Sequence, residues 1–445
     1  MSLPKPLGPY HVSFADFELR RSEENKGSRS GRAAEPEQQQ IKRNGVHPNA
    51  ANADSKAAAA AAAPPMRIFY PTETKTRWSP WDVKERCWIP HYNYMWGYVA
   101  RAFAPTSVFS RLGISVIASI FYSATWFRLP IQASVKKPLL TPKGEEGTKK
   151  QRLPVVIFSH GLWACHTTYS ATCVDLASHG YIVVAVEHLD GSSSMAHYHD
   201  HEGKCKWVHH AFGDKPVGET PMAERVKQLR QRVGEIQKVI DVLESLDQGS
   251  LMQNFNSVTG RASLDTKFFQ QRLDLNHIAM HGHSFGGATA IATSGVDKRI
   301  KCCLAEDVWW EPLEEVDYSR LAGKVPVLLL NTESFNWAAL RNGRKKFMKG
   351  RAQAHNEASP LITALMTIKG TTHMDQCDFP LLFPNIAKIA GMTGALQATH
   401  SKDINSRVCL DFLYKNLLPP ETGAPYLVDS VKEDGEHLLI GEVTD

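Results

Sequence analysis

The feature that most constrains the fold is a series of short apolar runs that begins at about residue 66. Each run is apolar throughout instead of alternating, which is typical of strands that a parallel sheet buries on both faces. The runs are MRIFYP (66–71), LPVVIFS (153–159), YIVVAVE (181–187), HIAMHG (277–282), KCCLAE (301–306), VPVLLLN (325–331) and ALMTIKG (364–370). Helical patterns lie between them, so we predict an α/β fold with a mostly parallel central sheet flanked by helices on both faces.

Two helical patterns carry further information. The clearest begins at Thr220 and is apolar along one face. The residues of this face are Met222, Val226, Leu229, Val233, Ile236, Ile240 and Leu243. The most apolar stretch of the chain, 112–127, is shorter than the roughly 20 residues that a membrane span needs. It therefore favours a buried or surface-docking helix over a transmembrane one.

Residues 22–65 differ in composition from the rest of the chain. They contain almost no apolar side chain larger than alanine, and they end in a poly-Ala tract and two prolines. Such a segment buries too little apolar surface to offset the entropy of ordering, which predicts a disordered low-complexity insertion. It separates an N-terminal strand within 1–21 from a main domain at 66–425, and a C-terminal tail follows at 426–445.

Charge and cysteine content narrow the functional classes. The net charge of the 445 residues is +5, and no run of Lys and Arg is long enough to indicate a nucleic-acid partner. A weakly basic surface suits anionic lipid. The 8 cysteines are scattered and form no C-x-x-C pair, and the first residues contain no apolar signal-peptide core. We therefore expect a cytoplasmic protein.

The sequence Gly282-His283-Ser284-Phe285-Gly286 has the G-x-S-x-G pattern of a nucleophile elbow. It follows the run HIAMHG and opens a helix of small residues, which is the context that the motif requires. The helix N-terminus favours a developing negative charge beside the serine. Ser284 is therefore the predicted nucleophile of a serine hydrolase with the α/β-hydrolase fold, and His283, inside the turn, is predicted to be structural.

A base and an acid must follow the nucleophile in the chain. His373 comes shortly after the run ALMTIKG, where a loop would present it, whereas His355 and His400 have no strand before them. His373 is therefore the predicted base. Two carboxylates follow strand ends, Asp307 after KCCLAE and Glu333 after VPVLLLN. Either could orient the imidazole, and although the commonest arrangement points to Glu333, the residues alone leave the choice open.

The segment FSHGLW, residues 158–163, is predicted to form the oxyanion hole. It follows the apolar run LPVVIF, and an H-G turn at this point brings backbone N–H groups close to the nucleophile, as the H-G-G-G segment of esterases does. The amides of Leu162 and Phe285 are the predicted donors to the oxyanion.

These segments resemble the platelet-activating factor acetylhydrolase family, the lipoprotein-associated and intracellular type II group. FSHGLWACHTTYSATCVDLASHGYIVVAVEHLDGSSS resembles the family's oxyanion segment and the unit after it, and GHSFGGATAI resembles its elbow. LGPYHVSFAD, RIFYPT and WIPHYNYMWGY resemble its opening strands and an interfacial aromatic helix. The similarity covers most of 7–20 and 66–420, whereas the insertion at 22–65 is not a feature of the family.

The resemblance implies an acid directly after the strand that follows the nucleophile helix, in a D-x-W context. Asp307, with Trp309 two residues later, matches this context and is favoured over Glu333. The resemblance also implies calcium-independent hydrolysis of the sn-2 ester of platelet-activating factor and of phospholipids with short or oxidised acyl chains, with no metal and no cofactor. A general carboxylesterase or lipase on the same fold is the alternative, and the intact triad disfavours a non-catalytic binding protein.

A histidine-rich segment follows the run YIVVAVE and has the residue types of a zinc or copper site. Its residues are His197, His199, His201, Cys205, His209 and His210. Polar histidines on a solvent-exposed loop explain the same pattern, so we expect no catalytic metal here.

Aromatic and apolar residues at helical spacing form a stripe that includes Val99. The candidate membrane-docking residues are Trp88, Tyr92, Met95 and Trp96 of this stripe, joined by Leu381, Leu382 and Phe383 after the base. Core packing is the ordinary reason for such a stripe, whereas its aromatic content and the family resemblance favour peripheral contact with a lipid surface. The spacing leaves both interpretations open, and it predicts no oligomeric state.

Overall fold

The computed structural model describes a large part of the chain, with gaps. The described residues are 3–18, 63–73, 86–103, 108–126, 129–140, 151–200, 202–211, 221–250, 266–313, 325–354, 363–417 and 435–441. Nearly all of the predicted insertion at 22–65 lies outside them, as do His201 and His355.

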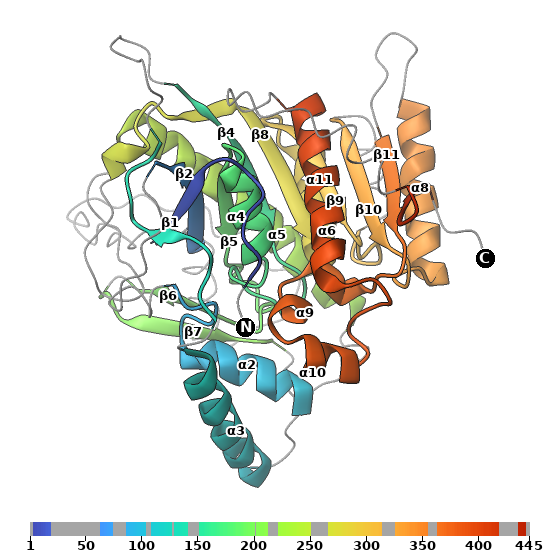
Figure 1. Ribbon diagram of the computed structural model, residues 1–445. Coiled ribbons are helices and arrows are strands. Elements are labelled where there is room, and N and C mark those ends of the chain that lie inside the picture. The colour runs from blue at the N-terminus through green and yellow to red at the C-terminus, as the bar shows by residue number, and fades with distance from the viewer. Residues whose placement is uncertain are drawn as a thin grey trace, which may run out of the picture.

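A long twisted sheet forms the centre of the molecule (Figure 1). Its strands are β1 (His11–Phe17), β2 (Met66–Thr72), β3 (Ser134–Val135), β4 (Leu153–Ser159), β5 (Ile182–Val186), β8 (Leu273–His283), β9 (Ile300–Glu306), β10 (Val327–Thr332), β11 (Thr363–Ile368) and β12 (Leu438–Ile440). In the described part of the chain the order is β12-β11-β10-β9-β8-β4-β5-β2-β1-β3. Neighbours from β5 to β11 pair in parallel, whereas β2 and β12 pair antiparallel to β5 and β11.

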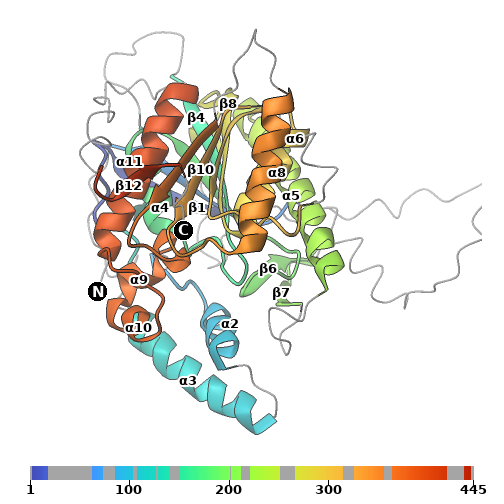
Figure 2. The same cartoon turned by 90° about the vertical axis from the view of Figure 1, so that its right-hand side faces the viewer.

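Helices cover both faces of this sheet, as Figures 1 and 2 show. One face packs against α4 (Ser170–Ser178) and α11 (Ala398–Asn416). The other packs against α5 (Met222–Gln248), α6 (Phe285–Val296) and α8 (Ala338–Ala354). The remaining elements are α2 (Tyr92–Phe103), α3 (Val108–Trp126), α9 (Phe379–Leu382), α10 (Pro384–Ile389), the 3₁₀ helices η3 (Thr266–Phe268) and η4 (His373–Gln376), and the hairpin of β6 (Met195–His199) and β7 (Cys205–His209).

The architecture confirms the predicted α/β-hydrolase fold. Every apolar run singled out in the sequence forms a strand of the sheet, and β4 and β5 are buried along their whole length. Covered on both faces, such strands have no solvent-facing positions that would call for polar residues. The predicted N-terminal strand is β1, which pairs with β2. The segment 426–445, predicted as a tail, instead supplies β12, whose Ile440 lies opposite Met366 of β11.

The long helix α5 departs from the predicted apolar face at its N-terminal half. Leu229 and Ile236 are buried as predicted, but Met222 is 41% exposed. Arg225 and Arg232 are fully buried instead. This half of α5 borders loops at the ends of the strands, where backbone carbonyls and carboxylates replace apolar neighbours.

The buried members of the aromatic stripe are core rather than a docking surface. Trp88 is buried before α2 begins, and its indole N–H donates a hydrogen bond to Asp378 at 2.9 Å. Met95 and Leu382 are buried as well. The prediction of docking through these residues is wrong because packing against other segments, including α3 beside α2, removes them from solvent.

The other members of the predicted docking set are partly buried against the same core. Tyr92 donates a hydrogen bond to the carbonyl of Ser115 on α3 at 3.1 Å, and Trp96 packs edge-on against His209. Leu381 and Phe383 also pack against the core. None of the helices in the described ranges combines the length and apolarity that a membrane span requires.

Candidate active site

The turn between β8 and α6 presents Ser284. Its backbone has φ 59° and ψ −116°, a strained conformation at the end of a strand. A Cβ added to Gly286 would lie 1.9 Å from the carbonyl oxygen of Ser159. Only glycine allows this approach of α6 to β4, so the predicted strand-turn-helix elbow is present in the structure.

The structure brings Ser284, His373 and Asp307 into one hydrogen-bonded line. The Ser284 hydroxyl donates to Nε2 of His373 at 3.0 Å, and Nδ1–H of His373 donates to Oδ2 of Asp307 at 3.0 Å. His373 begins η4 just after β11, and Asp307 directly follows β9. Asp307 is completely buried. This is the geometry in which a serine hydroxyl can lose its proton to an imidazole that a carboxylate orients.

Asp307, and not Glu333, meets the imidazole. The amide of Thr332 donates to Oδ1 of Asp307 at 2.7 Å, and the Thr332 hydroxyl donates to Oδ2 at 2.6 Å. Glu333 is exposed and accepts a hydrogen bond from the amide of Gly370 at 2.6 Å. Thr332, the last residue of β10, therefore holds the catalytic carboxylate of Asp307 in place, and Glu333 after it does not supply the acid.

Two rings pack against the imidazole of His373. Phe335 stacks on one side, with ring centroids 3.8 Å apart and an interplanar angle of 14°. His283 lies 4.3 Å away at 36°. Burial and the neighbouring His373 hold the pKa of His283 well below its ordinary value, so His283 is neutral. Its place beside the base agrees with the predicted structural role, whereas Phe335 and Thr332 carried no sequence signal.

Tyr169 connects the elbow to the predicted oxyanion segment. Its hydroxyl donates to Nδ1 of His283 at 2.8 Å and accepts a hydrogen bond from the amide of Gly161 at 3.2 Å. A Cβ on Gly161 would lie 3.3 Å from Cβ of Ser284. Leu162 consequently lies beside the nucleophile, and both residues line the same pocket.

A buried polar network from α5 holds this segment in place. Arg232 donates to the carbonyl of His160 at 2.6 Å and to Oδ2 of Asp190 at 3.0 Å. His188 bridges the hydroxyl of Ser159 at 2.8 Å and the carboxylate of Glu235 at 2.7 Å. Burial raises the pKa of Glu235 to about 8. The polar residues of α5 thus fix the loop that carries the amide of Leu162.

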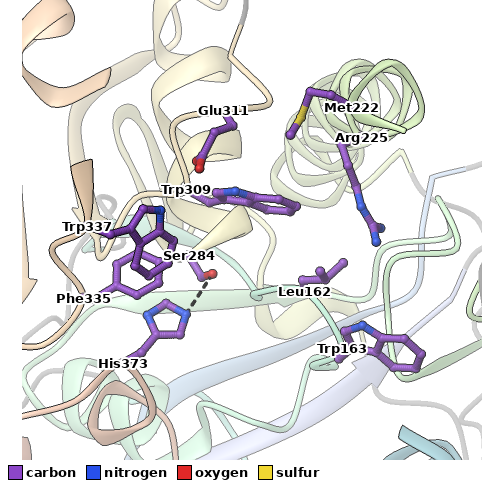
Figure 3. A pocket seen from close by; sticks show the side chains of 10 residues that line it. All are labelled: Leu162, Trp163, Met222, Arg225, Ser284, Trp309, Glu311, Phe335, Trp337 and His373. Carbon is purple, nitrogen blue, oxygen red and sulfur yellow. Dashed lines mark hydrogen bonds between the residues drawn. The ribbon is translucent and has the colours of Figure 1, made fainter. Parts of the chain in front are cut away.

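A pocket of about 410 Å³ opens over the nucleophile (Figure 3). Its lining is largely aromatic and apolar, with two charged side chains. The lining residues are Leu162, Trp163, Met222, Arg225, Ser284, Trp309, Glu311, Phe335, Trp337 and His373. Such a volume suits a small acyl group and part of the molecule that bears it.

Within the described residues, which exclude His201, the side chains of the histidine-rich segment do not converge on one point. It forms β6 and β7, in which His197 is buried beside the Tyr94 hydroxyl at 2.9 Å and His199 contacts Glu18 at 2.7 Å. His210 stacks on Trp163 with ring centroids 3.4 Å apart. The side chains are therefore engaged with different partners.

Other groups of potential metal ligands occur within the described residues. They are Cys165, His166 and Glu187; His281, Glu306 and Cys409; and His283, Asp307 and His373. Each contains a histidine that is hydrogen-bonded to a carboxylate, as between His281 and Glu306 at 2.9 Å. Hydrogen bonding between the side chains themselves accounts for these clusters.

Comparison with known proteins shows to which family the chain belongs. Residues 33–421 match the family described as platelet-activating factor acetylhydrolase, isoform II, so the match begins inside 22–65. The chain is similar to platelet-activating factor acetylhydrolase of Cavia porcellus (30% identity over 79% of this chain and 72% of the relative) and of Bos taurus (29%, 84% and 76%). A ferulic acid esterase from Streptomyces cinnamoneus shares the fold, with a TM-score of 0.55 at 16% identity over 99% of both chains. The chain thus belongs to the platelet-activating factor acetylhydrolase, isoform II, family.

Proposed function

We propose that the protein hydrolyses the sn-2 acyl ester of platelet-activating factor, and of phospholipids with short or oxidised acyl chains, through an acyl-enzyme on Ser284. The observation that carries the proposal is the Ser284–His373–Asp307 line in a pocket of a chain from this family. Hydrolysis of general carboxylic esters is the coarser alternative, because the triad by itself does not select the alcohol. A cytoplasmic location is part of the proposal.

The reaction proceeds in two halves. Oγ of Ser284 attacks the ester carbonyl carbon while Nε2 of His373 takes its proton, and Asp307 stabilises the imidazolium. The amides of Leu162 and Phe285 donate to the developing oxyanion. The lyso-phospholipid alcohol leaves with the proton from His373, and the acyl group remains on the serine. Water then attacks the acyl-enzyme with His373 as the base, which releases the carboxylic acid and restores the hydroxyl of Ser284.

A panel of substrates in EDTA tests this function. We expect the purified protein to hydrolyse a 2-acetyl ether phospholipid about a hundredfold more efficiently in kcat/KM than the same lipid with a long sn-2 chain, because the pocket cannot enclose that chain. EDTA should leave the rate unchanged, since backbone amides supply the charge stabilisation.

Both lipids are presented in the same mixed micelles, and release of the free acid is measured. Equal rates on the two chains would contradict the short-chain preference. Complete and reversible loss in EDTA would contradict the metal-free mechanism. Hydrolysis of p-nitrophenyl acetate without hydrolysis of either lipid would favour the general carboxylesterase.

We further propose that the protein contacts lipid through exposed apolar residues of α3 and α10, which lie at the same end of the molecule (Figures 1 and 2). Val116, Ile120 and Phe121 are exposed on α3. Ile386 and Ile389 are exposed on α10, which comes soon after His373. Apolar side chains of this kind support reversible peripheral binding when they insert into the acyl boundary.

The double change Ile120→Ser and Ile389→Ser tests this surface. The two side chains are 64% and 88% exposed, so their replacement should not disturb the core. We expect the dissociation constant for phosphatidylcholine liposomes to rise roughly ten- to a hundredfold, since full burial of an isoleucine contributes about 1.5–3 kcal/mol. Sedimentation with liposomes measures the change. Ile440→Ser, at a position on β12 that is 82% exposed, is the matched control, and equal binding by all three proteins would exclude this surface.

A further inference from the structure

Glu311 places a carboxylate in the wall of the pocket, and one of its oxygens has no hydrogen-bond partner in the described part of the chain. It lies two residues after Trp309 and lines the pocket together with Ser284 and His373. Its Oε2 is buried and accepts no hydrogen bond. A carboxylate oxygen removed from water in this way is unfavourable unless a positive or hydrogen-donating group meets it. The triad makes no use of Glu311, so its presence in the pocket calls for a ligand.

The aromatic neighbours of Glu311 indicate which ligand fits. Figure 3 shows the carboxylate directed toward the side of the pocket where Trp309 and Trp337 lie. Trp337 is 48% exposed although it is a large apolar residue, and it packs edge-on against Phe335 with ring centroids 4.5 Å apart. Indole faces attract cations, above all weakly hydrated quaternary ammonium groups. A carboxylate beside two indoles therefore has the chemistry of an alkylammonium site.

The second charge of the pocket lies elsewhere. Arg225 of α5 lines the pocket on the other side of Trp309 in Figure 3, and its guanidinium carbon lies 5.9 Å from the centroid of that indole. The pocket thus carries a negative group and a positive group on different elements. A headgroup that combines a phosphodiester with an ammonium has the complementary pair of charges.

We propose that Glu311, with Trp309 and Trp337, binds the quaternary ammonium of a choline headgroup and makes the enzyme selective for choline phospholipids. The proposal rests on the proposed function, because the headgroup must belong to the ester that Ser284 cleaves. Selectivity has two sources here: attraction of the ammonium by the carboxylate and indoles, and repulsion of headgroups with net negative charge by the same carboxylate.

The test compares two water-soluble 2-acetyl ether lipids that differ only at the headgroup, one with phosphocholine and one with phosphomethanol. We expect the wild type to have a kcat/KM ratio of about ten in favour of choline, and Glu311→Gln to reduce this ratio to about one. Gln has nearly the same shape, so the change removes the charge, and one acceptor oxygen becomes a donor, while the volume is kept. Glu333→Gln makes the same change of charge on the exposed carboxylate after β10 and should keep the wild-type ratio.

The outcomes separate this inference from the proposed function. Hydrolysis of both lipids with a ratio that Glu311→Gln does not alter would overturn the choline site and leave the phospholipid activity standing. Hydrolysis of p-nitrophenyl acetate with neither lipid cleaved would overturn the proposed function itself. A second measurement uses the wild type alone: glycerophosphocholine should inhibit p-nitrophenyl acetate hydrolysis at about tenfold lower concentration than glycerophosphomethanol. Equal inhibition by the two would also overturn the choline site.

Discussion

Replacing Ser284 with alanine is expected to lower kcat for ester hydrolysis by roughly 10⁶. The side chain of Ser284 is the hydroxyl at the elbow, and its hydrogen bond to Nε2 of His373 shows which proton the base can take. Without Oγ no acyl-enzyme forms, and the oxyanion donors and the pocket retain only the residual effect of binding. Hydrolysis of a soluble acetyl ester measures the loss of kcat, and covalent labelling by a fluorophosphonate measures whether a reactive serine remains.

Ser245→Ala supplies the control for this loss. Ser245 lies on α5, and its hydroxyl donates to the carbonyl of Asp241 within that helix. This variant should keep full activity and full labelling. If purified Ser284→Ala retained substantial hydrolysis, or if the probe still labelled it, another residue would be the nucleophile.

The change Asp307→Asn is expected to lower kcat by roughly 10⁴. An asparagine amide at this position would turn an N–H toward His373 or favour the wrong imidazole tautomer, and the imidazolium would lose its counter-charge. Thr332 would also keep donors directed at a group that is no longer a carboxylate. Steady-state kinetics on the soluble ester at several pH values measure the loss.

Glu333→Gln is the matched variant, because it makes the same chemical change on the carboxylate that the sequence left open. Glu333 is exposed and accepts a hydrogen bond from the amide of Gly370, not from a triad residue, so the kcat of Glu333→Gln should stay within about threefold of wild type. A larger loss of kcat in Glu333→Gln than in Asp307→Asn would show that Glu333 is the acid.

The parallel part of the fold could be predicted because its signal is local. The buried parallel strands β4, β5 and β10 are runs of apolar residues, and this pattern can be recognised in each run without knowledge of its neighbours. The elbow around Ser284 can be predicted for the same reason, since the strand, the glycines and the helix follow one another in the chain. His373 was predicted from its place after β11.

The features of the fold and the site that could not be predicted from the sequence depend on contacts between distant segments. The stripe at Trp88 and Met95 has the same spacing whether it faces lipid or protein, and only the packing of neighbouring segments, α3 among them, decides. Thr332 contacts Asp307 and Phe335 contacts His373. The members of each pair are distant in the chain and come together only in the folded structure. Glu311 follows two tryptophans in a short irregular segment without a motif. A buried carboxylate oxygen that lacks a hydrogen bond can be recognised only once its surroundings are known.

The place of β12 in the sheet has a consequence for biosynthesis. Among the described strands β12 leaves the ribosome after all the others, yet it lies at the edge of the sheet against β11. Until 438–440 has emerged, β11 presents unpaired backbone N–H and C=O groups along that side, which is the kind of edge on which chains aggregate. The nascent protein therefore carries an open edge until 438–440 has emerged and paired with β11, and in that interval the edge is prone to aggregation.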